Sequence, residues 1–376
     1  MKLTILKDEF KKGLTYVERI CAKNITLPIL NHVLLSAGKN QLKLVTTNLE
    51  IASLYFCLAK VEKEGEITVP VRTLSDTVSL TETPSLDIEA KGKTLSLIGE
   101  DTKVQIKGMD PKDFPIIPKI EKSQEIEMNP KPLSEGILQV IDFCSPTQTR
   151  PELSGVFFSF SKDQLKIVTT DSFRLAEKTL FFEKPQELFE EKSFILPRGA
   201  AREIINMFSE NENKIKLFCS SGQVMFESYF ADSQNPQAQL ISRLIEGEFP
   251  DYQAVIPKGY HTQVVLDKKQ FLNKIKTASI FAGGGNEIML SVDPKKSKVE
   301  ISAQNTDLGE AALEIKAGAK GEKVKTCFNW RFLFEGISKI QTEEFIFELN
   351  QEGGPGVIKP KDNQDFLYIL MPIKQG

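Results

Sequence analysis

The sequence predicts an α+β protein made of three copies of one domain, each with two helices packed on antiparallel sheet. Two observations support this prediction. One stretch of sequence recurs along the chain, and within each copy segments with helical periodicity alternate with segments that have strand periodicity. Three copies would fill the 376 residues at about 125 residues each, near the common size of a domain.

The recurrence is clearest in one strand-like segment. Gln41–Asn48 returns 123 residues later as Gln164–Asp171, and Val299–Asn305 is a weaker third copy. Further landmarks recur in the same order, namely Val69–Arg72 with Leu196–Gly199, and Phe114–Pro115 with Phe249–Pro250. This spacing predicts three domains, at residues 1–123, 124–252 and 253–376.

Each copy is expected to begin with an amphipathic helix, because apolar side chains recur there at spacings of three and four residues. These side chains are Phe10, Leu14, Val17 and Ile20 within Lys7–Ile20, then Leu133, Ile137, Val140 and Ile141, and finally Phe271, Ile275, Ala278 and Ile280. A second helix is expected in each copy, at Val71–Leu80, Gly199–Phe208 and Trp330–Ile340.

The remaining segments alternate with a period of two, which is typical of antiparallel strands and hairpins. In the first copy we expect Leu42, Leu44 and Thr46 on one face of a strand and Val45 on the opposite face. Strands and helices together in one copy indicate a sheet with helices on one side. The segments Pro111–Pro132 and Asp251–Thr262 are interpreted as extended connections.

Cysteine use and hydropathy indicate a cytoplasmic protein without a membrane partner. The five cysteines lie far apart and form no CxxC pair, which is typical of free thiols in a reducing compartment. The N-terminal segment carries charges too early for a signal peptide. No apolar run approaches the roughly 18 residues that span a bilayer.

The net charge of −3 does not by itself favour a nucleic-acid partner, yet basic residues gather on the expected helices. They are Lys268, Lys269, Lys274 and Lys276, then Lys7, Lys11, Lys12 and Arg19, and also Arg72, Arg198, Arg202 and Arg331 at the starts of second helices. Solvated helix surfaces explain most lysine runs. The alternative is that equivalent helices of the three copies form one surface that contacts phosphates, whatever the base sequence.

Catalytic motifs are missing from the sequence. The two histidines, His32 and His261, pair with no recognisable serine or cysteine motif. No phosphate-binding loop, dinucleotide fingerprint or HExxH motif occurs. We expect no cofactor, no metal and no catalytic residue. A hydrolase that uses Asp171 and His32 remains the enzyme alternative.

Five motifs give the chain a specific resemblance. They are Thr26–Leu30 (TLPIL), Arg150–Val156 (RPELSGV), Thr169–Ala176 (TTDSFRLA), Phe249–Tyr252 (FPDY) and Tyr368–Ile373 (YILMPI). In this order and at this spacing they resemble the bacterial sliding clamps, the beta subunits of DNA polymerase III. The resemblance covers the whole chain. It implies a ring-shaped homodimer, closed head to tail, that encircles duplex DNA without reading its sequence and makes polymerases processive.

The resemblance also implies partners and sites. The partners would be the clamp loader, the DNA polymerase III alpha subunit, and other polymerases and repair proteins that carry clamp-binding peptides. The groove for these peptides would consist of Leu153, Thr170, Ser172, Arg174, Leu175, Pro250, Val255, Asn329, Phe332, Ile369, Met371, Pro372 and Ile373. DNA would be contacted by Lys23, Arg72, Arg150 and Arg198. Ring closure would bring Val104 and Ile106 of one chain to Ile280 and Phe281 of the other.

The chain departs from the family pattern at several positions. Asn24, Gly199 and Ala254 stand where basic residues are common, so individual DNA contacts differ from those of the family. Phe173 takes a groove position that is often polar, and residues 232–237 form a lengthened hairpin loop. The alternative function from another class is a monomeric adaptor that binds peptides in the same groove without encircling DNA.

Overall fold

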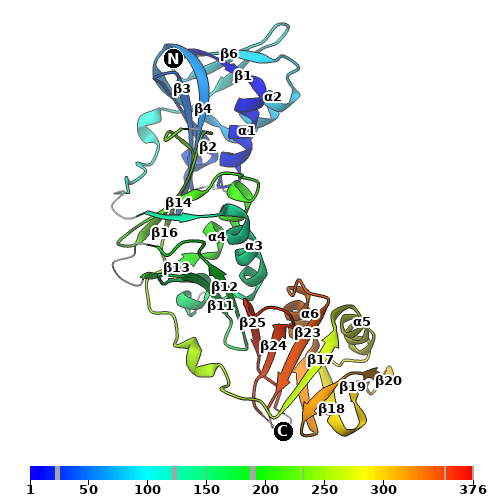
Figure 1. Cartoon of the computed structure of the whole chain (residues 1–376). Coiled ribbons are helices and arrows are strands. Elements are labelled where there is room, and N and C mark those ends of the chain that lie inside the picture. The colour runs from blue at the N-terminus through cyan, green and yellow to red at the C-terminus, as the bar shows by residue number, and fades with distance from the viewer. Residues whose placement is uncertain are drawn as a thin grey trace. The chain divides into compact units, whose positions relative to one another are not determined.

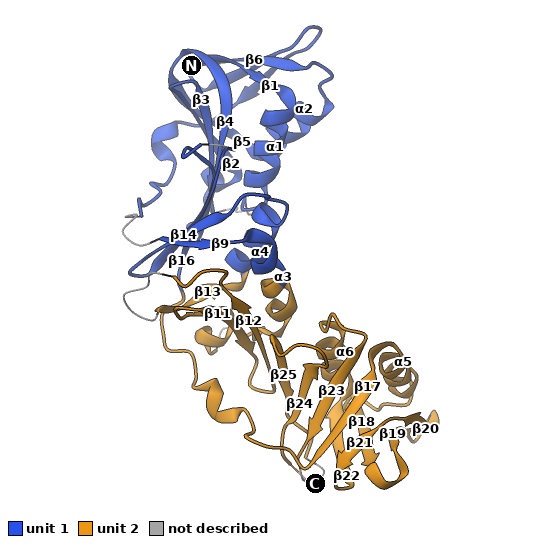
Figure 2. Cartoon of the chain, viewed as in Figure 1, with its two compact units in different colours: residues 1–135, 199–244 blue, residues 136–198, 245–376 orange. Residues whose placement is uncertain are grey.

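In the computed structural model, the described residues are 1–21, 26–120, 125–147, 149–186, 192–231, 233–350 and 353–374. The chain forms two compact units, each assembled from two separate stretches (Figure 2). Unit 1 comprises residues 1–135 and 199–244, and unit 2 comprises residues 136–198 and 245–376. The second sequence copy therefore contributes to both units.

Unit 1 is built on a 12-stranded antiparallel sheet whose main path runs β8-β7-β6-β1-β4-β16-β15-β14-β9. Its strands are β1 (Lys2–Leu6), β2 (His32–Gly38), β3 (Gln41–Thr47), β4 (Ile51–Lys63), β5 (Gly65–Pro70), β6 (Ser85–Lys91), β7 (Thr94–Ile98), β8 (Lys103–Lys107), β9 (Glu125–Met128), β14 (Ile215–Ser220), β15 (Gln223–Tyr229) and β16 (Pro236–Arg243). The pairing of β4 with β16 joins the first sequence copy to the second.

Unit 2 holds a nine-stranded sheet in the order β13-β10-β11-β12-β25-β24-β23-β17-β21 and a four-stranded sheet in the order β20-β19-β18-β22. The strands are β10 (Gly155–Phe160), β11 (Gln164–Thr170), β12 (Arg174–Phe181), β13 (Lys192–Pro197), β17 (Thr262–Asp267), β18 (Glu287–Asp293), β19 (Lys298–Asn305), β20 (Gly309–Lys316), β21 (Ala319–Gly321), β22 (Val324–Asn329), β23 (Glu344–Leu349), β24 (Gly356–Pro360) and β25 (Phe366–Leu370). Here β12 pairs with β25 and joins the second copy to the third.

Six α-helices occur in the described part of the chain: α1 (Lys7–Glu18), α2 (Val71–Leu80), α3 (Pro130–Val140), α4 (Arg198–Phe208), α5 (Lys268–Ser279) and α6 (Trp330–Ser338). In the first copy α1 packs on β3, β4 and α2, and in the third copy α5 packs on β19, β20 and α6 (Figure 1). Two helices per copy on antiparallel sheet confirm the expected α+β architecture. None of the described helices is long and apolar enough to cross a bilayer.

Helix ends follow local capping. Helix α2 has the bounds that the sequence predicted. Asp267 and Asn329 start α5 and α6, because each side chain accepts a hydrogen bond from a backbone N–H two or three residues ahead. Ile280 is expected on the apolar face of helix α5. This helix ends at Ser279, however, so Ile280 lies just beyond it.

One expectation about the connections is wrong, and the burial of one strand residue is new. The segment Pro111–Pro132 is not a simple extended connection, because Pro111–Asp113 is a 3-10 helix, Glu125–Met128 pairs with β14 as β9, and Pro130 begins α3. Val45 lies on the face of β3 opposite Leu44, as expected, and both side chains are buried. Ile29, Leu30 and neighbouring residues cover the outer face of the sheet and enclose Val45 in a second apolar layer.

Candidate functional site

A cleft opens in unit 2 above the pairing of β12 with β25. Four segments line it: the β11–β12 turn, the 3-10 helices η4 (Pro151–Leu153) and η5 (Tyr252–Val255), and the chain around the end of β25. Its empty space, counted to the open mouth, is about 610 Å³. The lining residues are Arg150, Leu153, Thr170, Ser172, Phe173, Arg174, Leu175, Pro250, Asp251, Tyr252, Val255, Ile369 and Met371.

The β11–β12 turn forms one rim of the cleft and is held by side-chain hydrogen bonds. Asp171 Oδ1 accepts the backbone N–H groups of Phe173 (3.0 Å) and Arg174 (2.9 Å). Thr170 Oγ1 donates to the carbonyl of Arg174 (2.7 Å) and accepts from the N–H of Ser172 (3.2 Å). These bonds stabilise a φ of 76° at Ser172, a left-handed conformation that is uncommon for a residue other than glycine.

The cleft floor is apolar and continuous with a small core. Leu175 of β12 lies opposite Ile369 of β25, and both pack with Val168, Tyr252 and Val357. At the mouth, three apolar side chains stay in water: Phe173 is 63% exposed, Val255 53% and Met371 43%. Large apolar side chains that surround a hollow and remain exposed are typical of a surface that a partner covers.

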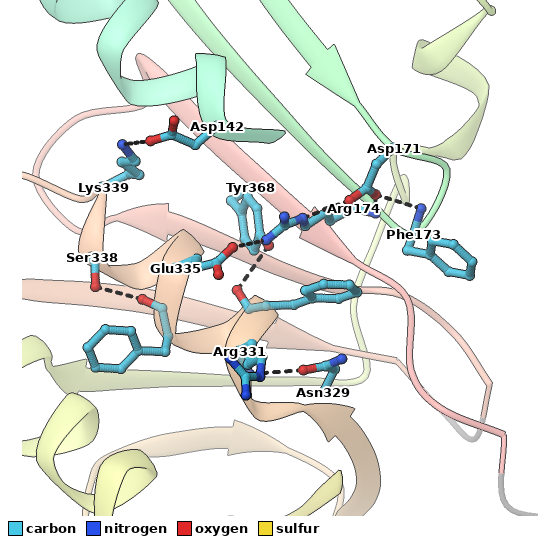
Figure 3. A network of polar contacts seen from close by, with 12 residues as sticks. Asp142, Asp171, Phe173, Arg174, Asn329, Arg331, Glu335, Ser338, Lys339 and Tyr368 are labelled. Atoms are coloured by element: carbon cyan, nitrogen blue, oxygen red, sulfur yellow. Dashed lines mark hydrogen bonds and ion pairs between the residues drawn. The ribbon is translucent and has the colours of Figure 1, made fainter. Parts of the chain in front are cut away.

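One wall of the cleft carries a buried arginine (Figure 3). The Arg174 guanidinium lies 4.3 Å from the ring centre of Phe332 and 5.1 Å from that of Phe143. It donates from Nε to Asp171 Oδ2 (2.9 Å) and from a terminal nitrogen to Glu335 Oε2. Burial alone would lower the pKa of Arg174, but Glu335, the neighbouring Tyr368 and Asp171 together outweigh burial and raise it.

The structure brings together most of the side chains that the resemblance assigned to a groove. Nine line the cleft: Leu153, Thr170, Ser172, Arg174, Leu175, Pro250, Val255, Ile369 and Met371. Four do not. Phe332 lies beneath Arg174, Asn329 caps α6 by accepting the N–H of Arg331, and the N–H of Ile373 donates to Cys327, with Pro372 preceding it.

Sequence reasoning missed Asp251 and Tyr252 as lining residues. They directly follow the Phe249–Pro250 landmark, so the recurring motif was the signal that could have located them. The phenol of Tyr252 reaches the Glu177 carboxylate. Burial is the main cause that raises the pKa of Tyr252, and the contact with Glu177 raises this pKa further.

The residues expected to contact DNA lie in different surroundings. Arg72 is exposed on α2. Arg198, the first residue of α4, is exposed and lies 3.6 Å from Asp142. Arg150 lies at the mouth of the cleft, where it bonds to Glu152 (3.0 Å) and Ser172 (3.4 Å). Lys23 and Asn24 fall outside the described residues.

The residues expected at a dimer interface divide into two kinds. Ile106 is only 4% exposed and belongs to the core of unit 1, whereas Val104 beside it on β8 is half-buried. Ile280 is 61% exposed, and the ring of Phe281 lies beside Gly309, where β20 begins. On β8, Val104 is therefore partly accessible to solvent, whereas Ile106 is enclosed in the core.

The two residues of the enzyme alternative are each engaged locally. The Nδ1 atom of His32 lies 3.0 Å from the carbonyl oxygen of Pro28, and burial lowers the pKa of His32. The carboxylate of Asp171 holds the turn and Arg174 as described above. Among the described residues, no group of three or more histidine, cysteine or carboxylate side chains could hold a metal ion.

Comparison with known proteins gives one consistent result. The N-terminal, central and C-terminal domains of the DNA polymerase III beta subunit match residues 1–118, 127–251 and 253–374. The chain is 28% identical to the beta sliding clamp of Staphylococcus aureus over 390 aligned positions, which cover 100% of this chain and 99% of that one. The beta sliding clamp of Synechococcus elongatus is 27% identical with the same coverage.

Solved structures agree in fold. The DNA polymerase III subunit beta from Pseudomonas aeruginosa superimposes with a TM-score of 0.93 at 24% identity, and the beta subunit from Thermotoga maritima with a TM-score of 0.90 at 25% identity. Each comparison covers 100% of both chains. The fold described above is thus shared along its whole length.

Proposed function

Since this chain belongs to the family of DNA polymerase III beta subunits, the bacterial sliding clamps, we propose that the cleft of unit 2 holds its partner proteins and that the basic helices hold duplex DNA. A sliding clamp is a processivity factor with no catalytic step of its own. We assign to the cleft the clamp loader, the polymerase III alpha subunit, and other polymerases and repair proteins that carry a short clamp-binding peptide. The inferred site of action is the cytoplasm.

The observation that carries the proposal is the apolar mouth of the cleft. Exposed Phe173, Val255 and Met371 surround a hollow whose floor is Leu175 and Ile369. A short peptide could bury all of these side chains at once, while the polar groups of the rim fix its direction. Because Arg150 lies at this mouth, we assign it to the cleft and not to DNA.

For DNA we propose contacts from exposed cations of the helices. Arg72 on α2, Arg198 and Arg202 on α4, Lys276 on α5 and Arg331 on α6 are exposed. Phosphate contacts carry no base information, so such a surface would hold DNA of any sequence and release its charge contacts as salt rises. We retain residues 1–123, 124–252 and 253–376 as the proposed limits of the three clamp domains.

For the ring we propose that β8 of one chain pairs with β20 of a second. Each strand ends its sheet among the described residues, so each presents unpaired backbone groups. The exposed residues of β8 include Lys103 and Lys107, and those of β20 include Glu310 and Glu314. Opposite charges across an antiparallel pair favour this pairing over pairing of either edge with itself.

Retention on circular DNA tests the function as a whole. The protein is loaded onto nicked circles with the clamp loader of the same organism and ATP, washed in high salt, and the circles are then linearised. We expect retention on circles and loss from linear DNA, because salt removes phosphate contacts but does not open a closed ring. Loss from both under salt would instead support the monomeric adaptor.

The cleft is tested by Met371→Ala combined with removal of the residues after Ile373. Overlapping fluorescent peptides that tile the polymerase III alpha subunit of the same organism serve as probes. We expect the best-binding peptide to lose its affinity for this variant, while size-exclusion chromatography still shows a dimer. Unchanged peptide affinity would remove the cleft from the proposal.

The dimer edge is tested by Ile280→Arg combined with Phe281→Arg. Two new charges beside β20 would be left unpaired in an interface, which is costly. We expect this variant to elute at the mass of one 42.2 kDa chain. Elution as a dimer would place the ring contact elsewhere.

A further inference from the structure

The cleft wall contains a charged group whose partner lies outside the cleft. The Arg174 side chain is 11% exposed and lies between the rings of Phe143 and Phe332. Of its two carboxylate partners, Asp171 belongs to the rim turn and Glu335 belongs to α6. Neither carboxylate lines the cleft. A guanidinium so poorly solvated depends on both partners, because removal of one leaves a buried charge only half compensated.

Asp171 connects Arg174 to the rim of the cleft. Its Oδ2 atom accepts from Arg174 Nε, while its Oδ1 atom accepts the N–H groups of Phe173 and Arg174. The backbone N–H of Met371 donates to the carbonyl of Phe173 (2.8 Å), so the same turn also fixes the opposite rim. A change in the charge around Arg174 therefore reaches Phe173 and Met371, two of the three exposed side chains at the mouth.

Unit 1 contains the same turn without the ion pairs. There Asn48 Oδ1 accepts the N–H groups of Glu50 (3.0 Å) and Ile51 (2.7 Å), and Leu49 has the φ of 76° seen at Ser172. Ile51 occupies the position of Arg174. The turn thus forms with a neutral amide and an aliphatic neighbour, which means that the ion pairs of unit 2 are not needed to make it.

Glu335 ties this turn to a helix of the third domain. It lies one helical turn before Lys339, whose Nζ bonds to Asp142 (2.6 Å) and to the carbonyl of Leu138 (3.0 Å). Gln139 in turn donates to the carbonyl of Lys339 (3.0 Å). Helix α6 is therefore held to the central domain through Lys339 at its end and through Arg174 (Figure 3). At Arg174, beside the rim of the cleft, α6 contributes the Glu335 carboxylate and the ring of Phe332, of which only the carboxylate carries charge.

We propose that Glu335 is a positioning residue for partner binding: it holds Arg174 against the cleft wall and so keeps the rim turn in the geometry that accepts a peptide. The proposal rests on the peptide-binding role of the cleft. Without the Glu335 charge, Arg174 would turn towards solvent or compete with the turn amides for Asp171. Either movement would shift Phe173 away from Met371.

The first test is Glu335→Gln in the intact protein, with the best-binding alpha-subunit peptide as probe. Because the Glu335 side chain is 48% exposed, this variant should fold normally. We expect peptide affinity to fall about tenfold. A loss of this size corresponds to part of the free energy of one hydrogen bond to a charged group. Glu203→Gln is the matched control, since Glu203 is the sixth residue of α4 as Glu335 is the sixth residue of α6. It should bind the peptide as the wild type does.

A second variant separates positioning from general loosening. Asp171→Asn gives unit 2 the residue that unit 1 has at this place, so the turn can still form. We expect Asp171→Asn also to lower the affinity for the peptide. The double variant with Glu335→Gln should lose less affinity than the product of the two single fold-losses, because both substitutions act through Arg174. In Glu335→Gln, hydrogen exchange should quicken at the amides of Phe173 and Arg174 and stay unchanged at those of Glu50 and Ile51.

The outcomes are distinguishable. If Glu335→Gln binds the peptide as tightly as the wild type while the Met371 variant does not, the positioning role is wrong and the cleft stands. If neither variant changes the affinity, the cleft itself is not the partner site. Equal losses in Glu335→Gln and Glu203→Gln would mean that the loss does not come from the contact with Arg174, and would overturn the proposal.

Discussion

Units 1 and 2 each contain a strand pairing that joins two domains, in the same register. In unit 1, Ala52 of β4 lies opposite Ile241 of β16, and in unit 2, Leu175 of β12 lies opposite Ile369 of β25. The backbone bond beside each pair is also the same, from Arg243 to Glu50 (3.0 Å) and from Met371 to Phe173 (2.8 Å). The backbone therefore does not explain why the cleft described here lies in unit 2.

Side chains explain the difference. In unit 1 the 3-10 helix η1 (Pro28–Asn31) places Ile29 and Leu30 in the apolar layer over β3 and β4, and Ile120 packs against them. The corresponding helix η4 of unit 2 has Glu152 after its proline. Val255 follows Phe249 at the spacing by which Ile120 follows Phe114, but it stays exposed at the cleft mouth. A few substitutions thus separate a filled junction from an open one.

The helices beside the two junctions differ in the same sense. In α4, Met207 meets the hydroxyl of Ser53 and Ile204 is fully buried. In α6 the corresponding places hold Lys339, paired with Asp142, and Gly336, against which Tyr368 packs. The junction of unit 1 is therefore mainly apolar, whereas that of unit 2 relies on ion pairs and on one close approach of a ring to a helix.

The largest effect is expected from Gly336→Ala. A Cβ at this position would lie 2.1 Å from the ring of Tyr368, which is fully buried and bonds through its hydroxyl to Phe332. Overpacking of this kind costs about 3 kcal/mol, more than the gain in helix propensity. Trp330, the single tryptophan, lies in α6. The fluorescence of Trp330 should show that this variant unfolds at a lower urea concentration than the wild type. An unchanged midpoint urea concentration would mean that Tyr368 can move aside.

The next largest effects are expected when the side chains at the two junctions are exchanged, in the variants Leu175→Ala and Ala52→Leu. Leu175→Ala should weaken peptide binding by about 2 kcal/mol, because it removes the floor of the cleft. Ala52→Leu should lower the stability of unit 1 by about 2 kcal/mol through overpacking and leave the peptide bound. Fluorescence titration and urea denaturation measure the two quantities. Peptide loss in Ala52→Leu would break the distinction between the junctions.

The smallest effect concerns Glu203. Burial raises the pKa of this carboxyl group, and its Oε2 atom has no hydrogen-bond partner in the part of the chain that the structure describes. A carboxyl whose pKa is higher in the folded state favours folding at low pH and opposes it once ionised. Glu203→Gln should therefore raise the melting temperature at pH 7 and lose this advantage as the pH falls towards 4. A gain that is independent of pH would contradict this cause.

Local features of the fold could be predicted from the sequence, and features that depend on distant packing could not. Apolar spacing located the first helix of each copy, since each of these helices buries its own stripe, and the order of elements within the repeat located the second. The burial of Val45 on the second face of β3 could not be predicted, because its cover comes from η1 and from Phe114, outside the strand itself. Motif resemblance located most of the cleft lining, but the bond from Arg174 to Glu335 joins residues 161 positions apart and no local pattern encodes it.

The strand pairings that join the domains also have a mechanical consequence. In each of the ladders β4–β16 and β12–β25, five residue pairs lie in register. A force that shears one domain along the next acts on several backbone hydrogen bonds at once. Each ladder should therefore resist shear at its domain boundary. Under an applied force, we expect the segments outside these ladders to deform first.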